Sequence, residues 1–144
     1  MSFRYFVIGS GSIGQRHAGN LTALGADVTH YGWRGIASDA VIAEIAACNG
    51  QAGVVIATAT KVRLPLIEEC AKAGAALYIE KPISYRTSDV QKIFDLPTAT
   101  LERSVAGFMM RYHPIVQRLL ETPVKNIFRA SFEIRHDVTQ WRQN

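Results

Sequence analysis

Hydrophobic residues follow two different periods along most of the chain. Runs of aromatic and β-branched residues predict strands, and stretches with apolar residues every three or four positions predict helices. The expected strands cover residues 5–8, 26–31, 52–57, 76–79 and 104–108. The expected helices cover about 13–24, 38–48 and 64–72, followed by one that begins at Thr87 or Ser88 and carries Val90, Ile93 and Phe94. This alternation predicts a doubly wound α/β domain with a mainly parallel sheet.

Single elements add detail to this prediction. Ile13, His17, Leu21 and Leu24 recur on one face of the first helix, and Gly25 is placed to end it. Residues 52–57 are continuously apolar, as expected of a strand covered on both faces. The stretch between residues 34 and 54 is short for a full set of elements. We therefore expect one strand and one helix of the first half to be trimmed there.

The pattern changes near the end of the sequence. Apolar residues after Pro114 predict a helix, and residues 127–134 alternate like a strand of an open antiparallel sheet. Nothing follows that strand for it to pair with, because the chain ends soon after Trp141-Arg142. We expect one α/β domain over residues 1–122 and the start of a truncated second domain over residues 123–144.

A glycine turn joins the first predicted strand to the first predicted helix. Gly9, Gly11 and Gly14 form a GxGxxG pattern in this context, which is typical of Rossmann-type dinucleotide-binding domains. The first glycine permits the tight turn, the second lets a pyrophosphate approach the backbone, and the third lets helix and strand pack closely. Free amides at the helix start add an anion site. We predict that the turn Gly9-Ser10-Gly11-Ser12-Ile13-Gly14 binds a dinucleotide; the alternative is a connection that binds nothing.

Composition limits the classes of partner. The 144 residues are 48% hydrophobic with a formal net charge of +4, enough for one globular core. Basic and acidic residues are interspersed and no apolar run reaches bilayer length, so we expect neither nucleic acid nor a membrane as a partner. No signal-peptide pattern begins the chain, which predicts a cytoplasmic location. Cys48 and Cys70 lack metal-ligand spacing and are expected to be reduced and buried.

Lys81 is the candidate catalytic residue. The segment Glu80-Lys81-Pro82 follows a predicted parallel strand, at the edge where such sheets place functional groups. Pro82 favours an extended conformation for Lys81, which holds the ammonium away from the strand. A lysine whose pKa is lowered by partial desolvation can accept a hydroxyl proton while a hydride passes to a nicotinamide. The alternative is an ordinary surface lysine, ion-paired with Glu80.

Four segments occur in one order along the chain, at residues 9–17, 57–60, 80–82 and 107–114. In this order they resemble the Gfo/Idh/MocA family of NAD(P)-dependent oxidoreductases, named after glucose-fructose oxidoreductase, inositol dehydrogenase and a rhizopine-catabolism protein. The resemblance covers nearly the whole chain. It implies a sugar-like substrate and a second, mostly antiparallel domain that supplies substrate contacts.

The resemblance also assigns roles to single residues. It implies that the three glycines hold the pyrophosphate, that Ala57 and Thr58 lie beside the cofactor, and that Glu80 contacts the nicotinamide side. Lys81 matches the catalytic lysine. Arg111 and His113 are implied to lie at the domain junction near the substrate side, with Arg111 counted among the cofactor contacts; packing or capping is the alternative for both.

The chain departs from the family pattern in places. Members usually carry Pro at the position of Ala59 and His at that of Arg63, so the loop there is expected to close differently. The second predicted strand ends in Tyr31-Gly32-Trp33-Arg34 without an acidic residue. Since no carboxylate is available for the ribose 2′-hydroxyl and Arg34 can pair with a 2′-phosphate, we expect NADP(H) to be favoured, with NAD(H) possible. The alternative for Arg34 is a solvated loop cation.

Three functions follow from these patterns. The first is the cofactor-binding portion of an oxidoreductase acting on a sugar, nucleotide sugar or cyclic polyol, with the isolated chain inactive without its second domain. The second is a non-catalytic dinucleotide-binding module left by truncation. The third, an S-adenosylmethionine methyltransferase, is disfavoured by Arg34 and by Glu80-Lys81-Pro82. The unpaired strand at 127–134 predicts a homodimer formed through the tail.

Overall fold

The computed structural model describes residues 2–33 and 38–122 and, in the tail, residues 125, 126, 128, 129, 131 and 133. The chain divides into two compact units, Met1–Phe108 and Met109–Asn144. The first unit contains the whole sheet and the predicted glycine turn. The predicted domain boundary after residue 122 stays a prediction.

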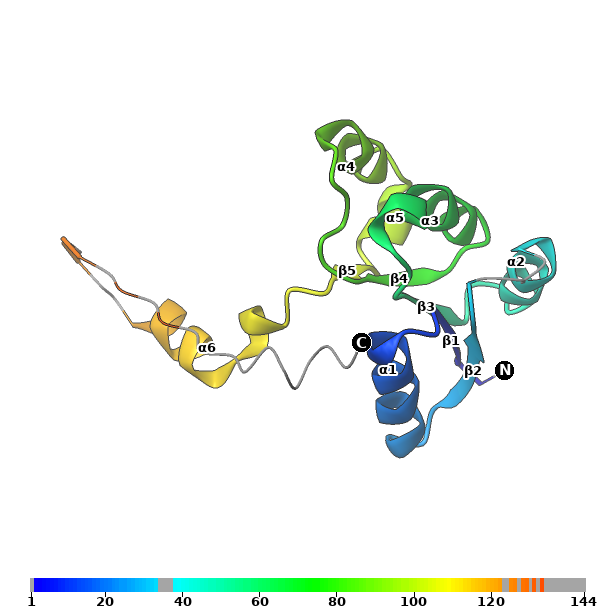
Figure 1. Cartoon of the computed structure of the whole chain (residues 1–144), viewed down its shortest axis with the longest axis horizontal. Helices are drawn as coiled ribbons and strands as arrows, with labels where there is room; N and C mark the ends of the chain where they lie inside the picture. Colours follow the sequence, from blue (N-terminus) through cyan, green and yellow to red (C-terminus); the bar gives the residue numbers. More distant parts are fainter. Residues whose placement is uncertain are drawn as a thin grey trace. The chain divides into compact units, whose positions relative to one another are not determined.

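Five parallel strands form the sheet of the first unit (Figure 1). They are β1 (Arg4–Ile8), β2 (Asp27–Tyr31), β3 (Ala52–Ile56), β4 (Ala76–Ile79) and β5 (Val105–Ala106). Their order is β2-β1-β3-β4-β5, and each neighbouring pair runs parallel. The predicted α/β fold with a parallel sheet is therefore confirmed. β5 is shorter than predicted because the amide of Ser104 is used in a turn, where it donates to Leu101.

The register brings the carboxyl ends of the central strands level with one another. Ile8 lies opposite both Tyr31 and Ile56, and Ile56 lies opposite Ile79. The loops that follow these residues therefore leave the sheet at one edge. Between β1 and β3 the strand order reverses direction, which is the point where open α/β sheets bind their ligands.

The sheet has β2 at its edge. A six-stranded Rossmann sheet has the order 3-2-1-4-5-6, in which a further strand flanks the second one. In the described part of this chain, β2 leads to α2 (Ser38–Ala46) and then directly to β3 on the other side of β1. The short stretch between residues 34 and 54 is consistent with this reduced arrangement.

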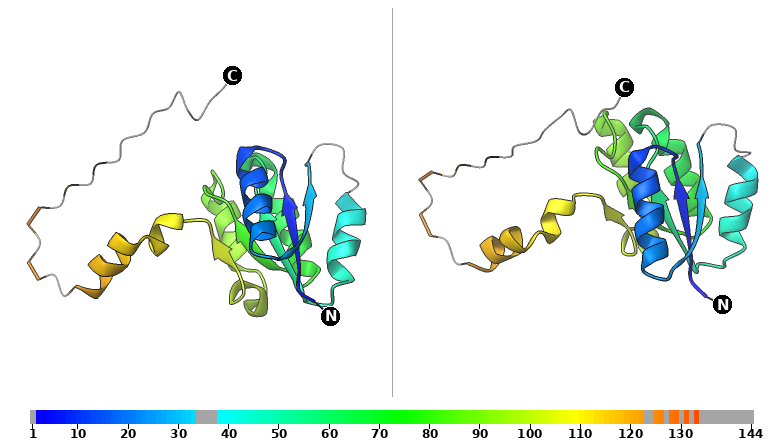
Figure 2. Two further views of the ribbon diagram at one scale, coloured as in Figure 1. Left: turned by 90° about the horizontal axis from the view of Figure 1, so that it is seen from below. Right: turned by 60° about the horizontal axis from the view of Figure 1, so that its bottom comes forward.

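Helices lie on both faces of the sheet, as Figures 1 and 2 show for α1 (Ser12–Ala23) and α3 (Arg63–Lys72). The main core lies between the strands and the helices α2 and α3. It is built from alternate strand residues, which all point to one face, and from the inner faces of the two helices. Its fully buried members include Phe6, Ile8, Val54, Ile56, Ile45 and Ile67.

Among the described residues, no helix combines the length and the apolar content that crossing a membrane requires.

Residues with left-handed backbone end several elements. Gly25, with a φ of +79°, follows α1 at the predicted position, and Asn49 and Gly50, with φ of 48° and 81°, follow α2. Leu24 was expected within the first helix, on the same face as Ile13, His17 and Leu21, but it lies outside the helix. The helix ends at Ala23, so that Leu24 belongs to the capping turn and is 83% exposed.

The fourth long helix, α4 (Thr87–Phe94), begins differently from the prediction. Arg86 occupies the N-cap position, and no side chain caps the helix. Ser84 instead accepts the Arg86 amide and donates to Asp89, which orders the turn before the helix. Phe94 is exposed and not part of the core. A short helix that was not predicted, α5 (Thr98–Leu101), follows.

Both cysteines are free thiols in buried positions. Burial raises the pKa of the Cys70 thiol to about 12. Cys70 therefore behaves as a small apolar core residue, and not as a thiolate, at neutral pH.

The second unit contains a short 3₁₀ helix, η2 (Met109–Tyr112), and the predicted helix after Pro114, α6 (Pro114–Glu121). His113 caps α6, because its Nδ1 accepts the Ile115 amide at 3.3 Å. Several apolar side chains of α6 are exposed: Ile115, Leu119 and Leu120. The strand predicted at 127–134 falls in large part, and Trp141-Arg142 entirely, outside the described residues.

Candidate functional site

The glycine turn lies at the carboxyl end of β1, and two of its glycines are required by the fold itself. Gly9 has a φ of +130°, and a Cβ there would lie 2.6 Å from the carbonyl of Ala57. A Cβ on Gly14 would lie only 1.8 Å from the carbonyl oxygen of Gly9. The tight turn and the close helix packing expected of these two positions are therefore present.

Gly11 has a different environment. An added Cβ at this position would meet no atom within 4 Å, so the fold itself does not demand glycine there. Gly11 is the N-cap of α1, and the first turn of this helix has neither a side-chain cap nor an acidic residue. Ser10, Gly11 and Ser12 are exposed. The backbone amides at the start of α1 are therefore open to an approaching acceptor.

The end of β2 supports the glycine turn. The Gly9 amide donates to the Tyr31 carbonyl at 2.8 Å, and His30 Nε2 lies 2.8 Å from the Gly9 carbonyl oxygen. Gly32 follows, and a Cβ on it would lie 3.6 Å from the side chain of Ser10. Gly32 therefore lies where the acidic residue that binds the ribose hydroxyl was expected, and it has space for a side chain. Arg34, the predicted contact for a 2′-phosphate, lies outside the described residues.

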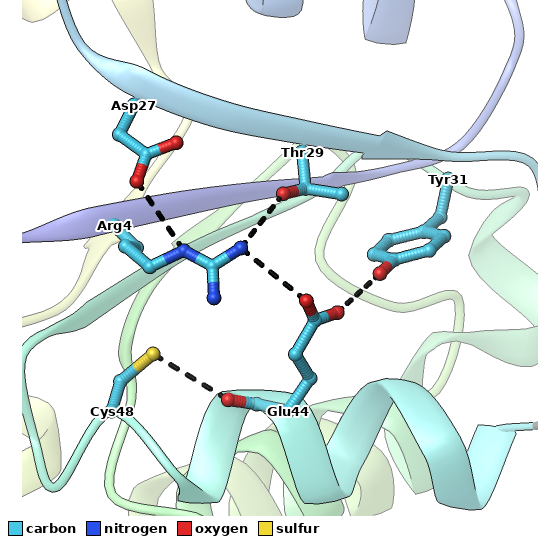
Figure 3. Close-up of polar contacts among 6 residues, drawn as sticks. All are labelled: Arg4, Asp27, Thr29, Tyr31, Glu44 and Cys48. Atoms are coloured by element: carbon cyan, nitrogen blue, oxygen red, sulfur yellow. Dashed lines mark hydrogen bonds and ion pairs between the residues drawn. The ribbon is translucent and has the colours of Figure 1, made fainter.

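A polar network ties α2 to the first two strands (Figure 3). The Tyr31 hydroxyl donates to the Glu44 carboxylate, whose other oxygen lies 3.3 Å from Arg4 Nη2. Arg4 also contacts Thr29 at 3.2 Å and Asp27 at 3.4 Å. The Tyr31 hydrogen bond lowers the pKa of Glu44 and raises the pKa of Tyr31. Because the Tyr31 carbonyl holds Gly9, this network also anchors the strand end on which the turn rests.

The loop after β3 passes directly beside the glycine turn. Ala57 donates its amide to Ile8 at 2.9 Å, and its carbonyl occupies the space that a side chain on Gly9 would need. Thr58 is 5% exposed, and its hydroxyl has no hydrogen-bond partner among the described residues. Buried hydroxyls are normally satisfied by a hydrogen bond. Thr58 therefore presents an unused donor and acceptor next to the turn.

Arg63, the first residue of α3, joins the loops after β3 and β4. It is 5% exposed, and its Nε and Nη2 donate to the Thr58 carbonyl at 2.9 and 2.6 Å. Its Nη1 donates to the carbonyls of Glu80 and Pro82. Where this chain departs from the family pattern, the loop is therefore closed by the arginine side chain itself, through backbone carbonyls.

Glu80 follows β4 and turns its carboxylate toward α1. Its Oε1 lies 2.9 Å from His17 Nε2, and its Oε2 accepts the backbone amide of Lys81 at 3.1 Å. Glu80 is 5% exposed. The His17 ring also packs edge-on against Tyr78, with 4.9 Å between ring centroids. The carboxylate thus connects α1 with the segment that carries Lys81. From the sequence, Glu80 was considered as an ion-pair partner of the Lys81 ammonium; in the structure its carboxylate contacts His17 instead.

Lys81 is exposed at the carboxyl edge of the sheet, and the peptide bond to Pro82 is cis. The side chain lines a hollow of about 370 Å³ together with Pro82, Ile83, Ser84, Val90 and Phe108. This hollow is mostly apolar. The partial desolvation expected for a catalytic lysine is not provided by the described residues, because they leave Lys81 open to solvent.

The predicted site residues of the first unit that the structure describes gather at one edge of the sheet; Arg34 is not among them. Contacts connect the glycine turn to Ala57 and Thr58, and Arg63 connects Thr58 to the Lys81 segment. Arg111 belongs to the second unit. The sequence reasoning missed the buried role of Arg63 and the pairing of His17 with Glu80. The available signal for Arg63 was a cation in the first turn of a helix, next to apolar residues, at a position that the helix dipole disfavours.

No family model matches this chain. Its sequence is 32% identical over 126 residues to inositol 2-dehydrogenase of Rhizobium meliloti strain 1021. That alignment covers 79% of this chain and 38% of the relative. The chain thus spans about two fifths of the length of the curated relative that it matches.

Several solved dehydrogenase structures contain a similar fold. UDP-N-acetylglucosamine 3-dehydrogenase from Acidithiobacillus ferrooxidans superposes with a TM-score of 0.64 at 24% identity, over 84% of this chain and 43% of that one. The WlbA dehydrogenase from Thermus thermophilus, solved in complex with NAD and UDP-GlcNAcA, also gives 0.64, at 19% identity over 84% of this chain and 46% of that one. The chain therefore has a fold found within dehydrogenases, and a curated relative in sequence is inositol 2-dehydrogenase.

Proposed function

We propose that this chain is the dinucleotide-binding part of an NAD(P)-dependent oxidoreductase of the Gfo/Idh/MocA family. The observation that carries the proposal is the glycine turn at the point where the strand order reverses, followed by a helix with an uncapped first turn. Helix starts of this kind bind pyrophosphate groups through backbone amides. The relation to inositol 2-dehydrogenase and the order of the four sequence segments support the family.

The residues present fit a nicotinamide dinucleotide. Gly11 leaves open space above the helix start, Gly9 and Gly14 shape the turn, and the Thr58 hydroxyl is buried beside it without a partner. In the proposed site Ser10, Ser12 and Ile13 contribute to the pyrophosphate contacts, and Ala57, Thr58 and Glu80 lie toward the nicotinamide. The cofactor, when bound, exchanges a hydride with the substrate. Arg111 is proposed as a further cofactor contact.

Lys81 is proposed to exchange the substrate proton at its Nζ. It stands at the carboxyl edge of the sheet beside the hollow lined by Val90 and Phe108. The chain aligns with only 38% of the length of inositol 2-dehydrogenase. We therefore propose that other parts of the enzyme cover Lys81 and supply most of the substrate contacts. The proposed substrate class is a sugar, nucleotide sugar or cyclic polyol, as the names of the relatives suggest.

Selectivity for NADP(H) over NAD(H) is the finer proposal. It is supported by Gly32, which leaves space beside Ser10 where NAD-selective Rossmann domains carry a carboxylate for the ribose hydroxyl. Arg34 is the proposed partner of the 2′-phosphate. The Thermus thermophilus relative was solved with NAD, which favours the opposite preference.

Calorimetric titration of the chain with NADPH and NADH tests both levels of the proposal. Binding of either dinucleotide supports the cofactor domain. Tighter binding of NADPH that disappears in Arg34→Ala supports the selectivity. Binding of neither overturns the proposed function.

A non-catalytic dinucleotide-binding module is the second candidate, favoured by the exposure of Lys81. It predicts cofactor binding without turnover even after the longer enzyme is reconstituted. A cytoplasmic location and self-association through the tail stay predictions.

A further inference from the structure

Arg63 is a buried cation with an unusual set of partners. Within the described part of the chain, all of its hydrogen bonds go to backbone carbonyls, those of Thr58, Glu80 and Pro82. Burying a charged group is costly unless its donors are satisfied. Burial lowers the pKa of the guanidinium, and the nearby Glu80 carboxylate opposes that shift. A cation at the start of a helix is also disfavoured by the helix dipole. An apolar side chain could fill this space at less cost if packing were all that mattered.

The carbonyl partners lie in the two loops that carry the proposed chemistry. Thr58 follows β3 and is the buried hydroxyl beside the glycine turn. Glu80 and Pro82 are the residues immediately before and after Lys81, and one nitrogen, Nη1, donates to both. The same side chain therefore holds the backbone on both sides of Lys81 and fixes its distance from the loop after β3.

The geometry requires the guanidinium fork. Arginine presents five N–H donors in one plane, whereas lysine presents a compact charge on a flexible stem. Lysine at this position could reach one loop or the other, but it could not donate from fixed directions to three carbonyls. Substitution by an apolar residue would leave buried carbonyls unpaired.

We propose that Arg63 is a positioning residue, which locks the Lys81 segment to the loop after β3 and thereby sets the orientation of Lys81 toward the bound nicotinamide. This inference rests on the proposed function for its second half only. The locking of the two loops stands on the contacts of the cofactor-free chain.

NMR on the whole 144-residue chain tests the inference. The variants are Arg63→Lys, which keeps the charge without the fork, and Arg63→Met, which removes both. Arg103→Met is the matched control, because Arg103 also donates to a backbone carbonyl, that of Gly50 at 2.6 Å, in an exposed position before β3. Chemical shifts and residual dipolar couplings are recorded for the backbone amides of residues 57–60, 80, 81 and 83, first without cofactor; Pro82 has no amide proton.

The expected result is a reorientation of both loops in Arg63→Lys while the amides of β1 and β2 keep their wild-type values. Arg103→Met is expected to leave both loops unchanged. Unchanged couplings at residues 80, 81 and 83 in Arg63→Lys would overturn the inference. If Arg63→Met fails to fold, the couplings of Arg63→Lys still decide whether Arg63 locks the loops. An independent test is hydrogen exchange of the Arg63 Nε proton in the wild-type chain, which is expected to be slow because this proton is bonded to the Thr58 carbonyl.

A second readout concerns the cofactor. Lysines are methylated reductively with ¹³C-formaldehyde, and the Lys81 methyl signal, assigned from a Lys81→Arg sample, is followed during titration with NADPH and NADH. The signal is expected to shift in the wild type and to lose most of that shift in Arg63→Lys, while the dissociation constant changes less than about threefold, well under one tenfold step in affinity. A full Lys81 shift in Arg63→Lys would overturn the role toward the nicotinamide. If the wild type binds no dinucleotide, the proposed function fails, whereas the loop couplings still decide whether Arg63 locks the loops.

Discussion

His17 and Glu80 form a 2.9 Å contact between the helix that begins at the glycine turn and the residue that precedes Lys81. The pair is 63 residues apart in sequence and is almost buried on the Glu80 side. It connects the part of the site assigned to the pyrophosphate with the part assigned to the reacting end of the cofactor. The Glu80 carboxylate therefore contacts both parts: one oxygen lies beside His17 of α1, and the other accepts the backbone amide of Lys81.

Replacing Glu80 tests this connection. Glu80→Ala leaves the His17 ring and the Lys81 amide without their acceptor, and we expect a loss of about 2 kcal/mol in the free energy of unfolding. Glu80→Gln retains an acceptor for one of the two donors and should cost less. Urea denaturation measures both variants. Equal stability of Glu80→Ala and the wild type would contradict the structural importance of the contact.

Gly11 and Gly14 should separate cofactor binding from folding. Gly11→Ala places a methyl group in open space, so the stability should change by less than about 1 kcal/mol, while dinucleotide affinity should fall at least about tenfold, or roughly 1.4 kcal/mol. Gly14→Ala forces a methyl group against the Gly9 carbonyl and should destabilise the chain by about 2–3 kcal/mol or more. Thermal unfolding and calorimetric titration measure the two effects. A stable Gly11→Ala variant with unchanged affinity would argue against pyrophosphate binding at the turn.

Gly32→Asp should change cofactor preference. The new Cβ fits at 3.6 Å from Ser10, and the carboxylate would accept the ribose hydroxyl of NADH but repel the 2′-phosphate of NADPH. We expect the ratio of the NADH and NADPH dissociation constants to move toward NADH by at least about tenfold, equivalent to roughly 1.4 kcal/mol. Gly19→Asp is the control, since it adds the same charge at an exposed helix position with open space around it. A similar shift in both variants would indicate a general charge effect.

The Tyr31 and Glu44 pair should make stability depend on pH at acid pH. The pKa of Glu44 is lowered from its ordinary 4.5, so its contribution is complete above that value and is lost as the pH falls through the lower folded-state pKa. Since Glu44 is partly exposed, Tyr31→Phe should cost only about 1 kcal/mol at neutral pH, and this cost should shrink in acid, where Glu44 is protonated.

The same pair acts in the opposite sense at alkaline pH. The hydrogen bond to Glu44 raises the pKa of Tyr31 above 10.0, so its contribution is complete below 10.0 and is lost as the pH rises through the folded-state pKa. We expect the free energy of unfolding, measured from pH about 3 to about 11, to depend less on pH in Tyr31→Phe than in the wild type at both ends of this range. Tyr112→Phe, at an exposed residue of the second unit, should follow the wild type. A cost of Tyr31→Phe that is constant over the whole range would contradict the coupling.

The fold was predictable where the local signal and the tertiary structure agree. The continuous apolar run of β3 and the glycine turn each indicate their element without help from distant residues, and both were placed within one residue of their observed bounds. Leu24 lies outside its predicted helix because helical periodicity cannot show where a helix ends. Phe94 lies on its predicted helix but is exposed, because periodicity cannot show which residues another layer covers. β5 was predicted too long because the turn that uses Ser104 follows a helix of only four residues.

The candidate site was predictable in its parts and not in its connections. Gly9, Thr58 and Lys81 follow strand ends, and parallel topology brings strand ends to one edge. His17 and Glu80, or Arg63 and Pro82, are joined by side chains that reach across the site, and no sequence spacing encodes such a reach. Arg63 was noticed only as a departure from a family pattern, whereas the structure shows what the arginine holds.

The edge position of β2 has a consequence for how the glycine turn fluctuates. Among the described residues β2 is hydrogen-bonded to one neighbouring strand, β1, and the Gly9 amide donates to the last carbonyl of β2. The hydrogen bonds of an edge strand can open in small local fluctuations instead of global unfolding. The adenosine end of the proposed cofactor site is therefore expected to fluctuate on a faster timescale than its nicotinamide end, which follows β3 and β4, two strands that are each paired on both sides. The hydrogen bonds of Glu44 to Tyr31 and Arg4 are expected to limit how far these fluctuations extend.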